Sequence, residues 1–284
     1  AVNSLLSPFL GAGFYYKTFM WPAAFWEKVY EPIIRKAAGL GRATYEPDPD
    51  SYEKCWAHCD LLVIGAGPAG LAAALTAGRA GARVILADEG FESGGSLLSE
   101  TAPVSGKSAS DLLAQTLAEL ADMPNVRIFS RTTVFGWYDD NVFGAVESVQ
   151  KNTATVDPNR PVERIWRIAA KQAILAAGAE ERPLVFGGND IPDVMMAGAM
   201  RSYLNRQAIA PGRSTIIFTN DASGYATAAD LEAAGLDIAA IVDVRPDATR
   251  TWSGKARIIP GAVIVDAKGG RSLKGVTVLG NGRT

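Results

Sequence analysis

The hydrophobic pattern divides the chain into an irregular beginning and a regular remainder. Residues 1–58 follow no steady period, because proline and glycine interrupt a run over 9–25 that is crowded with aromatic side chains. A helix is expected over 23–38, interrupted at Pro32, and an extended linker over 46–50. We therefore predict an irregular, aromatic-rich N-terminal extension over residues 1–58.

The pattern becomes regular at residue 59. A continuous apolar run over 61–64 predicts a strand that is buried on both faces of a parallel sheet. An alanine-rich segment over 71–80 predicts a helix, and the apolar run over 82–88 predicts a second strand. Together these segments form a β-α-β unit of about 30 residues, the usual size of that motif.

Shorter segments follow this unit and complete a first domain over 59–195. A helix is predicted over 111–121. Strands are predicted at 126–130, 134–137, 142–150, 154–156, 164–170 and 172–176. The second, third and fourth of these strands form a β-meander, so the fold class is α/β.

A second β-α-β unit is predicted inside a second domain over 196–284. Its parts are a strand at 214–218, a helix at 222–234, a strand at 238–244 and a closing hairpin over 263–267 and 276–279. The turn after its first strand lacks phosphate-binding glycines: Asp221 would place a negative charge beside phosphates, and Tyr225 is too bulky for close helix packing. We predict a Rossmann-like partner domain, degenerate in its glycine motif and without a nucleotide.

The turn after the first predicted strand carries the chemistry, and it reads Gly65-Ala66-Gly67-Pro68-Ala69-Gly70. Each glycine of the G-x-G-x-x-G pattern has a physical task. Gly65 permits the tight turn, Gly67 lets the backbone approach a pyrophosphate, and Gly70 lets the helix pack closely on the strand. The positive end of the helix dipole faces the phosphates. The turn therefore predicts a dinucleotide site.

An acid lies where such a site needs one. Asp88 follows the second strand, about 20 residues after the turn, and its carboxylate can accept hydrogen bonds from an adenosine ribose. The negative charge disfavours a 2′-phosphate, so NAD is expected rather than NADP. Glu89 takes the same role if the register differs by one residue. In the pair Gly94-Gly95, followed by Ser96, the glycines are expected to wrap the nucleotide and Ser96 to donate to a phosphate; a plain loop is the alternative.

Composition and charge exclude several other classes. The 284 residues are 48% hydrophobic and carry a formal charge of −2, which argues against a general nucleic-acid binder or a membrane-surface protein. No run of about 18 apolar residues and no signal peptide occur. Two cysteines make no disulfide framework, so we expect a cytoplasmic protein.

Neither a metal centre nor a catalytic triad is expected. Cys55, His58 and Cys59 lie close together in sequence, but three ligands without a fourth do not close a structural zinc site. The segment is instead a lead-in to the first strand. His58 is the only histidine of the chain, and with it alone no set of nucleophile, general base and orienting residue can be assembled. We expect any chemistry to be carried by the cofactor, with no catalytic residue in this chain.

Several segments resemble the α subunit of heterotetrameric sarcosine oxidases. They are SPFLGAGFYYKTFM (7–20), YEPIIRKAAGLG (30–41), AHCD (57–60), LADE (86–89), QAILAAGA (172–179) and RPL (182–184). The N-terminal segments are specific to that family, whereas the glycine turn is shared by many flavin and nicotinamide enzymes. The resemblance covers essentially the whole chain.

The resemblance implies a Rossmann-like FAD/NAD(P)-binding two-domain fold of the thioredoxin-reductase kind, with NAD held tightly in this chain. It implies partner β, γ and δ subunits, with FAD in the β subunit and FMN near the α–β contact. Such complexes oxidatively demethylate sarcosine to glycine, form hydrogen peroxide, and pass a one-carbon unit to tetrahydrofolate through a C-terminal domain that is absent here. We therefore expect the chain to be the N-terminal to central piece of a longer protein.

The resemblance also implies which residues contact NAD. They are Gly65, Gly67, Ala69, Gly70, Asp88, Glu89 and Ser96, with the backbone of Val134 facing the adenine. The family often has a basic residue after the acid pair, and Gly90 stands there instead, so no basic side chain is present there for a phosphate or ribose contact.

Two other hypotheses remain open on the sequence. The chain is alternatively the FAD-binding subunit of a related opine or proline dehydrogenase, with FAD on the same turn. The other hypothesis is a non-enzymatic scaffold whose nucleotide only stabilises the fold, because a ligand that binds the native state stabilises it by mass action.

Overall fold

The computed structural model describes residues 21–41, 45–151, 157–248 and 252–280. The chain consists of two compact units, residues 1–50 and 51–284, and each is described by itself. In the smaller unit a 3₁₀ turn (η2, Ala23–Phe25), a π-helical segment (η3, Trp26–Tyr30) and an α-helix (α3, Glu31–Ala37) follow one another.

The helical stretch of the smaller unit is divided beside Pro32. Pro32 lies in the first turn of α3, where its missing N–H removes no helical hydrogen bond. The expected interruption is therefore the start of a new helix. Most of the aromatic run over 9–25 lies outside the described residues.

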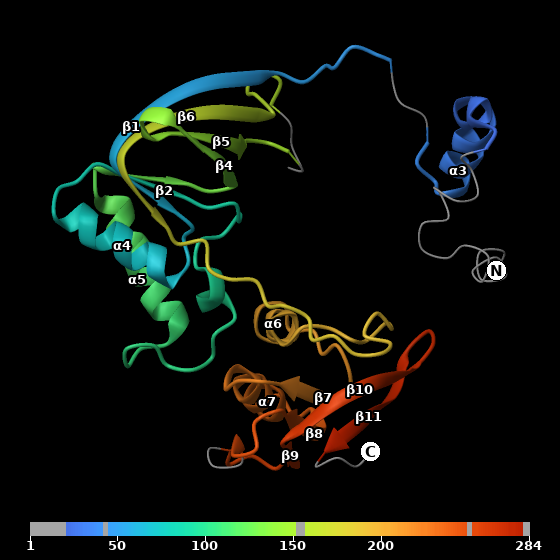
Figure 1. Cartoon of the computed structure of the whole chain (residues 1–284). Helices are drawn as coiled ribbons and strands as arrows, with labels where there is room; N and C mark the ends of the chain where they lie inside the picture. Colours follow the sequence, from blue (N-terminus) through green and yellow to red (C-terminus); the bar gives the residue numbers. More distant parts are fainter. Residues whose placement is uncertain (1–20, 42–44, 152–156, 249–251, 281–284) are drawn as a thin grey trace. The chain divides into compact units, whose positions relative to one another are not determined.

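The larger unit is built on a six-stranded sheet with the order β3-β2-β1-β6-β5-β4 (Figure 1). The strands are β1 (Tyr52–Ile64), β2 (Val84–Ala87), β3 (Val126–Phe129), β4 (Thr132–Tyr138), β5 (Val142–Ser148) and β6 (Glu163–Leu175). Strands β3, β2, β1 and β6 run parallel, and β5 and β4 continue the sheet antiparallel. The order of the parallel strands reverses beside β1, which is where such sheets bind ligands at their carboxyl edge.

Both faces of the parallel strands are buried, as their continuous apolar runs predict. Helices α4 (Pro68–Arg79) and α5 (Ala109–Asp122) pack on one face, around a core that includes Val63, Leu71 and Leu86. The other face contributes Leu62 and Ile85 to a core with residues of β5 and β6. Ser108 caps α5 by accepting a hydrogen bond from the amide of Asp111 at 3.0 Å.

The first strand is longer than predicted, which corrects the expected extension over 1–58. Strand β1 begins at Tyr52, because residues 52–59 pair in parallel with residues 163–170 of β6. Residues 52–58 therefore belong to the sheet and not to the extension. Strand β6 is likewise one element where two strands were predicted, and the strand expected at 154–156 lies outside the described residues.

The second β-α-β unit is present. Strands β7 (Ser214–Thr219), β8 (Asp237–Asp243) and β9 (Ile258–Pro260) form a parallel sheet, α7 (Ser223–Ala233) connects the first two, and β10 (Ala262–Gly269) and β11 (Leu273–Gly280) form a hairpin. Five elements were not predicted: η4 (Gly95–Leu98), η5 (Asp139–Asn141), α6 (Ala197–Arg201), the π-helical η6 (Ser202–Arg206) and strand β9. The hairpin packs against the β7–β8–β9 sheet around Val242 and Ile264.

Candidate functional site

The glycine turn joins β1 to α4 at the carboxyl edge of the parallel strands. Gly65 has φ of +103°, and a Cβ there would lie 2.4 Å from the carbonyl oxygen of Ala176, which follows β6. A Cβ at Gly70 would lie 1.8 Å from the carbonyl oxygen of Gly65. Because both positions exclude a side chain, the turn is packed tightly against β6 and against its own helix.

Gly67 differs, because open space surrounds it. A Cβ there would meet only the Cα of Gly95, at 3.9 Å. Gly67 is the N-cap residue of α4, with extended backbone angles, and no side chain caps the first turn of this 12-residue helix. Ala69 and Gly70 lie in that first turn. An anionic group can therefore approach the helix N-terminus over Gly67, which fits a pyrophosphate.

Asp88 lies directly after β2 and directs its carboxylate to the glycine turn. Its Oδ2 accepts a hydrogen bond from the Ala66 amide at 2.5 Å, and its Oδ1 accepts one from the Gly90 amide at 2.8 Å. A carboxylate has about four acceptor positions, so about two remain for hydroxyl groups. The structure thus brings the predicted acid and the predicted turn together.

The glycine pair after β2 lies against the same turn. The amide of Gly94 donates to the carbonyl oxygen of Ala66 at 2.8 Å, and a Cβ at Gly95 would lie 2.8 Å from the Cα of Gly67. Ser96 follows as an exposed residue of η4. Glu89 is exposed beside Asp88. Both predicted contact residues are therefore accessible to a ligand.

Val134 lies on β4, the terminal strand of the sheet, and pairs with Ala145 of β5. Its connection to the acid is short: the amide of Thr132, two residues earlier, donates to the Asp88 carbonyl oxygen at 2.7 Å. Val134 also lines a cavity of about 380 Å³. The other lining residues are Ile64, Gly136, Trp137, Asn141, Phe143, Ala173 and Leu175. The cavity therefore begins at the strand end that leads into the glycine turn.

In the second β-α-β unit, the carboxylate at the corresponding position is already hydrogen-bonded to other side chains of the protein. Asp243, at the end of β8, is fully buried. It accepts hydrogen bonds from Arg245 Nη2 at 2.7 Å and from the Tyr225 hydroxyl at 2.8 Å. Burial and the Asp243 carboxylate raise the pKa of Tyr225 to about 12, so the phenol stays a donor. These bonds support the prediction that this unit holds no nucleotide.

The expectation that Tyr225 prevents close helix packing is wrong. The close approach occurs one residue earlier, where a Cβ at Gly224 would lie 2.6 Å from the Cβ of Thr219. Tyr225 is itself buried, with its ring 5.7 Å from that of Trp252. The helix therefore packs on its strand with a tyrosine at the position of the third glycine.

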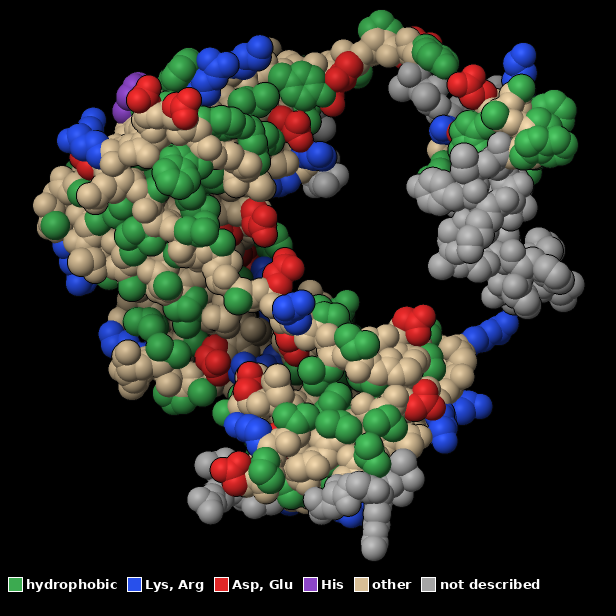
Figure 2. Space-filling model, in the orientation of Figure 1, with side chains coloured by type: hydrophobic (Ala, Val, Ile, Leu, Met, Phe, Trp, Pro, Cys, Tyr) green, Lys and Arg blue, Asp and Glu red, His purple; other side chains and the backbone are tan. Residues whose placement is uncertain are grey.

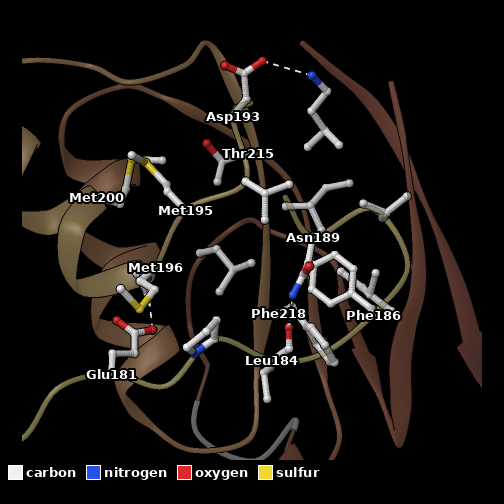
Figure 3. Close-up of a pocket in the computed structure, with 18 of the residues that line it drawn as sticks. Glu181, Leu184, Phe186, Asn189, Asp193, Met195, Met196, Met200, Thr215 and Phe218 are labelled. Atoms are coloured by element: carbon white, nitrogen blue, oxygen red, sulfur yellow. Dashed lines mark hydrogen bonds between the residues drawn. The ribbon is translucent and has the colours of Figure 1, made fainter. Parts of the chain in front are cut away.

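A second cavity, of about 210 Å³, lies beside β7 (Figure 3). Apolar side chains dominate its labelled wall, with Met195, Met196 and Met200 on one side and Phe186 and Phe218 on the other. Among its labelled polar side chains, Glu181, Asn189 and Asp193 bond to backbone groups. Glu181 accepts from the amides at 197 and 198, and the Asn189 side chain donates to the carbonyl at 184. The cavity therefore combines an apolar wall with polar side chains that the backbone already engages.

A polar cluster around the buried Asp230 joins the segment after η4 to the second β-α-β unit. Arg201 binds Asp230 through Nε at 2.6 Å and Glu100 through Nη2 at 2.9 Å. Thr101 and Asn205 donate further hydrogen bonds to the Asp230 carboxylate. Because Thr101 and Asp230 are 129 residues apart, no local pattern in the sequence could have indicated this cluster.

The cluster predicts a loss of stability in acid. Burial raises the pKa of Asp230, but hydrogen bonds from Thr101, Arg201 and Asn205 outweigh it and leave the pKa lowered. A carboxylate with a lowered folded-state pKa stabilises the fold above its unfolded pKa of about 3.9, and this contribution is lost as pH falls through the lower folded value. We expect the urea midpoint to fall steeply below about pH 4, and less steeply for Asp230→Asn. Equal slopes for the two proteins would contradict this assignment.

The cysteines and the histidine lie apart across β1. Cys55 and Cys59 face the buried core, whereas His58 is exposed on the opposite face, because side chains alternate along a strand. Burial raises the pKa of Cys59 to about 11, so its thiol stays protonated and unreactive. No group of three potential metal ligands occurs among the described residues.

The charged side chains of both signs are interspersed over the visible face of the molecule (Figure 2). Among the described residues on this face, Lys and Arg side chains gather into no broad basic field of the kind that binds nucleic acid. Among the residues that the structure describes, no helix is both long and apolar enough to span a bilayer.

The chain is similar in sequence to a known protein family and to known relatives. The model of the pyridine nucleotide-disulphide oxidoreductase family matches residues 59–210. The chain is 66% identical over all its 284 residues to the sarcosine oxidase subunit alpha of Rhizobium meliloti (strain 1021), of which it spans 29%. The resemblance to sarcosine oxidase α subunits is thereby confirmed.

Two solved structures share the fold. L-proline dehydrogenase from P. horikoshii superposes with a TM-score of 0.59 at 22% identity, over 83% of this chain and 41% of that one. Thioredoxin reductase from Lactococcus lactis superposes with a TM-score of 0.57 at 18% identity, over 80% and 72% of the two chains. The expected two-domain, thioredoxin-reductase-like α/β fold is confirmed. The chain belongs to the pyridine nucleotide-disulphide oxidoreductase family.

Proposed function

We propose that this chain is the NAD-binding part of the α subunit of a heterotetrameric sarcosine oxidase. The observation that carries the proposal is the open glycine turn: Gly67 leaves room for a pyrophosphate while Asp88 directs a carboxylate to the same turn. The identity of 66% to a sarcosine oxidase subunit alpha supports the choice of enzyme.

Within this proposal the nucleotide is held by the first domain, which begins with β1 at Tyr52 and ends at residue 195, and the second domain, 196–284, supports it without a nucleotide. The proposed contacts are Gly65, Gly67, Ala69, Gly70, Asp88, Glu89, Ser96 and Val134. Bound NAD supplies a two-electron hydride acceptor and stabilises the native chain by mass action. The residues of the chain bind and orient it, and none is proposed to be catalytic.

The rest of the proposed activity belongs to the whole complex. We place FAD and FMN outside this chain, with β, γ and δ subunits as partners, in the cytoplasm. The complex oxidises sarcosine to glycine, forms hydrogen peroxide and transfers one carbon to tetrahydrofolate. Peroxide formation by the assembled complex, measured with sarcosine and in parallel with an opine, tests the substrate. A faster reaction with the opine would contradict the proposal.

The Asp88→Ala variant tests the nucleotide site. We expect NAD affinity to fall by about 1–3 kcal/mol, the scale of a hydrogen bond to a charged group. The Asp88→Asn variant loses the charge, and its NH2 group cannot accept from one of the two backbone amides that Asp88 binds, so we expect a similar loss for NAD but a gain in NADP binding relative to NAD. Titration calorimetry with both nucleotides measures these effects.

Glu89→Ala provides the matched comparison for Asp88. Because Glu89 is exposed and Asp88 faces the turn, we expect the loss at position 88 to be the larger one. A larger loss of NAD affinity for Glu89→Ala would show that Glu89, and not Asp88, binds the ribose. Unchanged NAD affinity in both variants would show that neither acid at the end of β2 binds the ribose.

A further inference from the structure

The cavity of about 380 Å³ beside the glycine turn has no assigned occupant. Two of its lining residues lie next to the turn in sequence and in space. Ile64 directly precedes Gly65, and Leu175 precedes Ala176, whose carbonyl oxygen closes against Gly65. The cavity therefore reaches the strand ends that lead into the site that we propose for NAD.

Strand β4 connects the cavity to Asp88. Strand β4 begins beside this acid, since the Thr132 amide bonds to the Asp88 carbonyl oxygen. Val134, two residues further along β4, lines the cavity. A ribose bound to the Asp88 carboxylate would therefore carry its base toward the wall that Val134 forms. The pyrophosphate side leads instead to Gly67 and the N-terminus of α4.

The wall holds an indole ring that is exposed and yet fixed in place. Trp137 is 73% exposed, although it is the largest apolar side chain of the cavity. Its ring lies parallel to that of Phe143, with an interplanar angle of 4° and centroids 6.1 Å apart. Its Nε1 donates to Asn141 Oδ1 at 3.2 Å, and the Asn141 amide donates to the Lys171 carbonyl oxygen at 3.4 Å. Ring orientation is thus set from two sides.

The chemistry of the wall favours a flat, uncharged ring. None of the lining side chains carries a charge, and most of them are apolar. Such a wall gains nothing from a phosphate or a carboxylate, whereas stacking on an aromatic side chain stabilises any nucleobase. A preoriented ring loses little conformational entropy when the base arrives.

We infer that Trp137 forms the stacking wall for the adenine of the bound dinucleotide, with Phe143 and Asn141 as the residues that position its indole ring. This inference rests on the proposed function, because it names the place of the base at the same site. Trp137 is then the residue on which the affinity for the adenosine half depends, whereas the other half of the dinucleotide gains nothing from it.

Titration of the nucleotide-free, full-length protein tests this inference, with NAD, ADP-ribose and nicotinamide mononucleotide as separate probes. For Trp137→Ala we expect NAD and ADP-ribose to bind about tenfold more weakly, the scale of one lost base–aromatic stack. Trp137→Phe keeps an aromatic wall, so its affinity should stay within about twofold of the parent, while the fluorescence quenching that NAD causes should diminish. Nicotinamide mononucleotide should bind all three proteins alike.

Trp56→Ala is the matched control, because Trp56 is also an exposed tryptophan, at 59%, but lies on β1 outside the cavity. It should leave the affinity for NAD unchanged. If Trp137→Ala binds ADP-ribose as tightly as the parent while Asp88→Ala does not, the stacking role is wrong and the NAD site stands. If the parent itself binds neither NAD nor ADP-ribose, the proposed function fails and this inference with it.

Discussion

The Gly67→Val variant is expected to fold normally and to lose NAD affinity by more than about 100-fold, or about 2.7 kcal/mol. The protein itself has room for the side chain, since a Cβ at Gly67 meets only the Cα of Gly95 at 3.9 Å, and its φ of −75° suits any residue. The added atoms would instead fill the space that a pyrophosphate requires. Titration calorimetry measures the affinity, and thermal unfolding without nucleotide measures the fold.

Gly212→Val serves as the control for this variant. A Cβ at Gly212 meets nothing within 4 Å, and this glycine lies before β7, away from the turn. The same change there should leave binding and stability unaltered. Gly70 is unsuitable as a probe, because a Cβ there collides with the turn itself and would disturb the fold. NAD bound at full affinity by a folded Gly67→Val protein would show that the turn is not the site.

The Asp230→Ala variant is expected to lower the free energy of unfolding by about 3–5 kcal/mol, the usual effect of removing one partner from a buried ion pair. The Asp230 side chain is 7% exposed and that of Arg201 is 17% exposed. Without the carboxylate, Arg201 keeps Glu100 alone, and the donors of Thr101 and Asn205 lose their shared acceptor. Urea unfolding at neutral pH measures the loss.

Asp122→Ala is the control for that variant. Asp122 ends α5 on the surface, and changes of this kind are usually within about 0.5 kcal/mol. A loss below about 1 kcal/mol for Asp230→Ala would contradict the role of the cluster. It would then contribute nothing beyond an ordinary surface ion pair.

The elements that the sequence predicts best are those whose signal is local. The apolar run over 61–64 forms a strand, the glycine motif forms a tight turn, and the alanine-rich segment after it forms a helix. The conformation of each of these elements depends on residues that are neighbours in the sequence. Asp88 was found for the same reason, since its distance from the turn is set by the length of one β-α-β unit. The place of these residues at one strand end follows directly from parallel pairing.

The features that the sequence did not reveal depend on partners far along the chain. The segment before residue 59 became part of β1 because β6 lies beside it, more than a hundred residues later. The Arg201 cluster and the wall of Trp137 arise in the same way, from strands and loops that only the tertiary fold brings together. The size of Tyr225 alone does not predict its buried position, because the partner of its hydroxyl, Asp243, lies 18 residues further along the chain.

The central claim is that the glycine turn holds NAD. The most direct test is to purify this chain, denature it, and identify the released nucleotide by mass spectrometry beside the visible spectrum of the native protein. We expect a colourless protein that releases NAD, with Gly67→Val releasing none. A yellow protein that releases FAD from the same turn, or a folded chain that neither contains nor binds a dinucleotide, would contradict it.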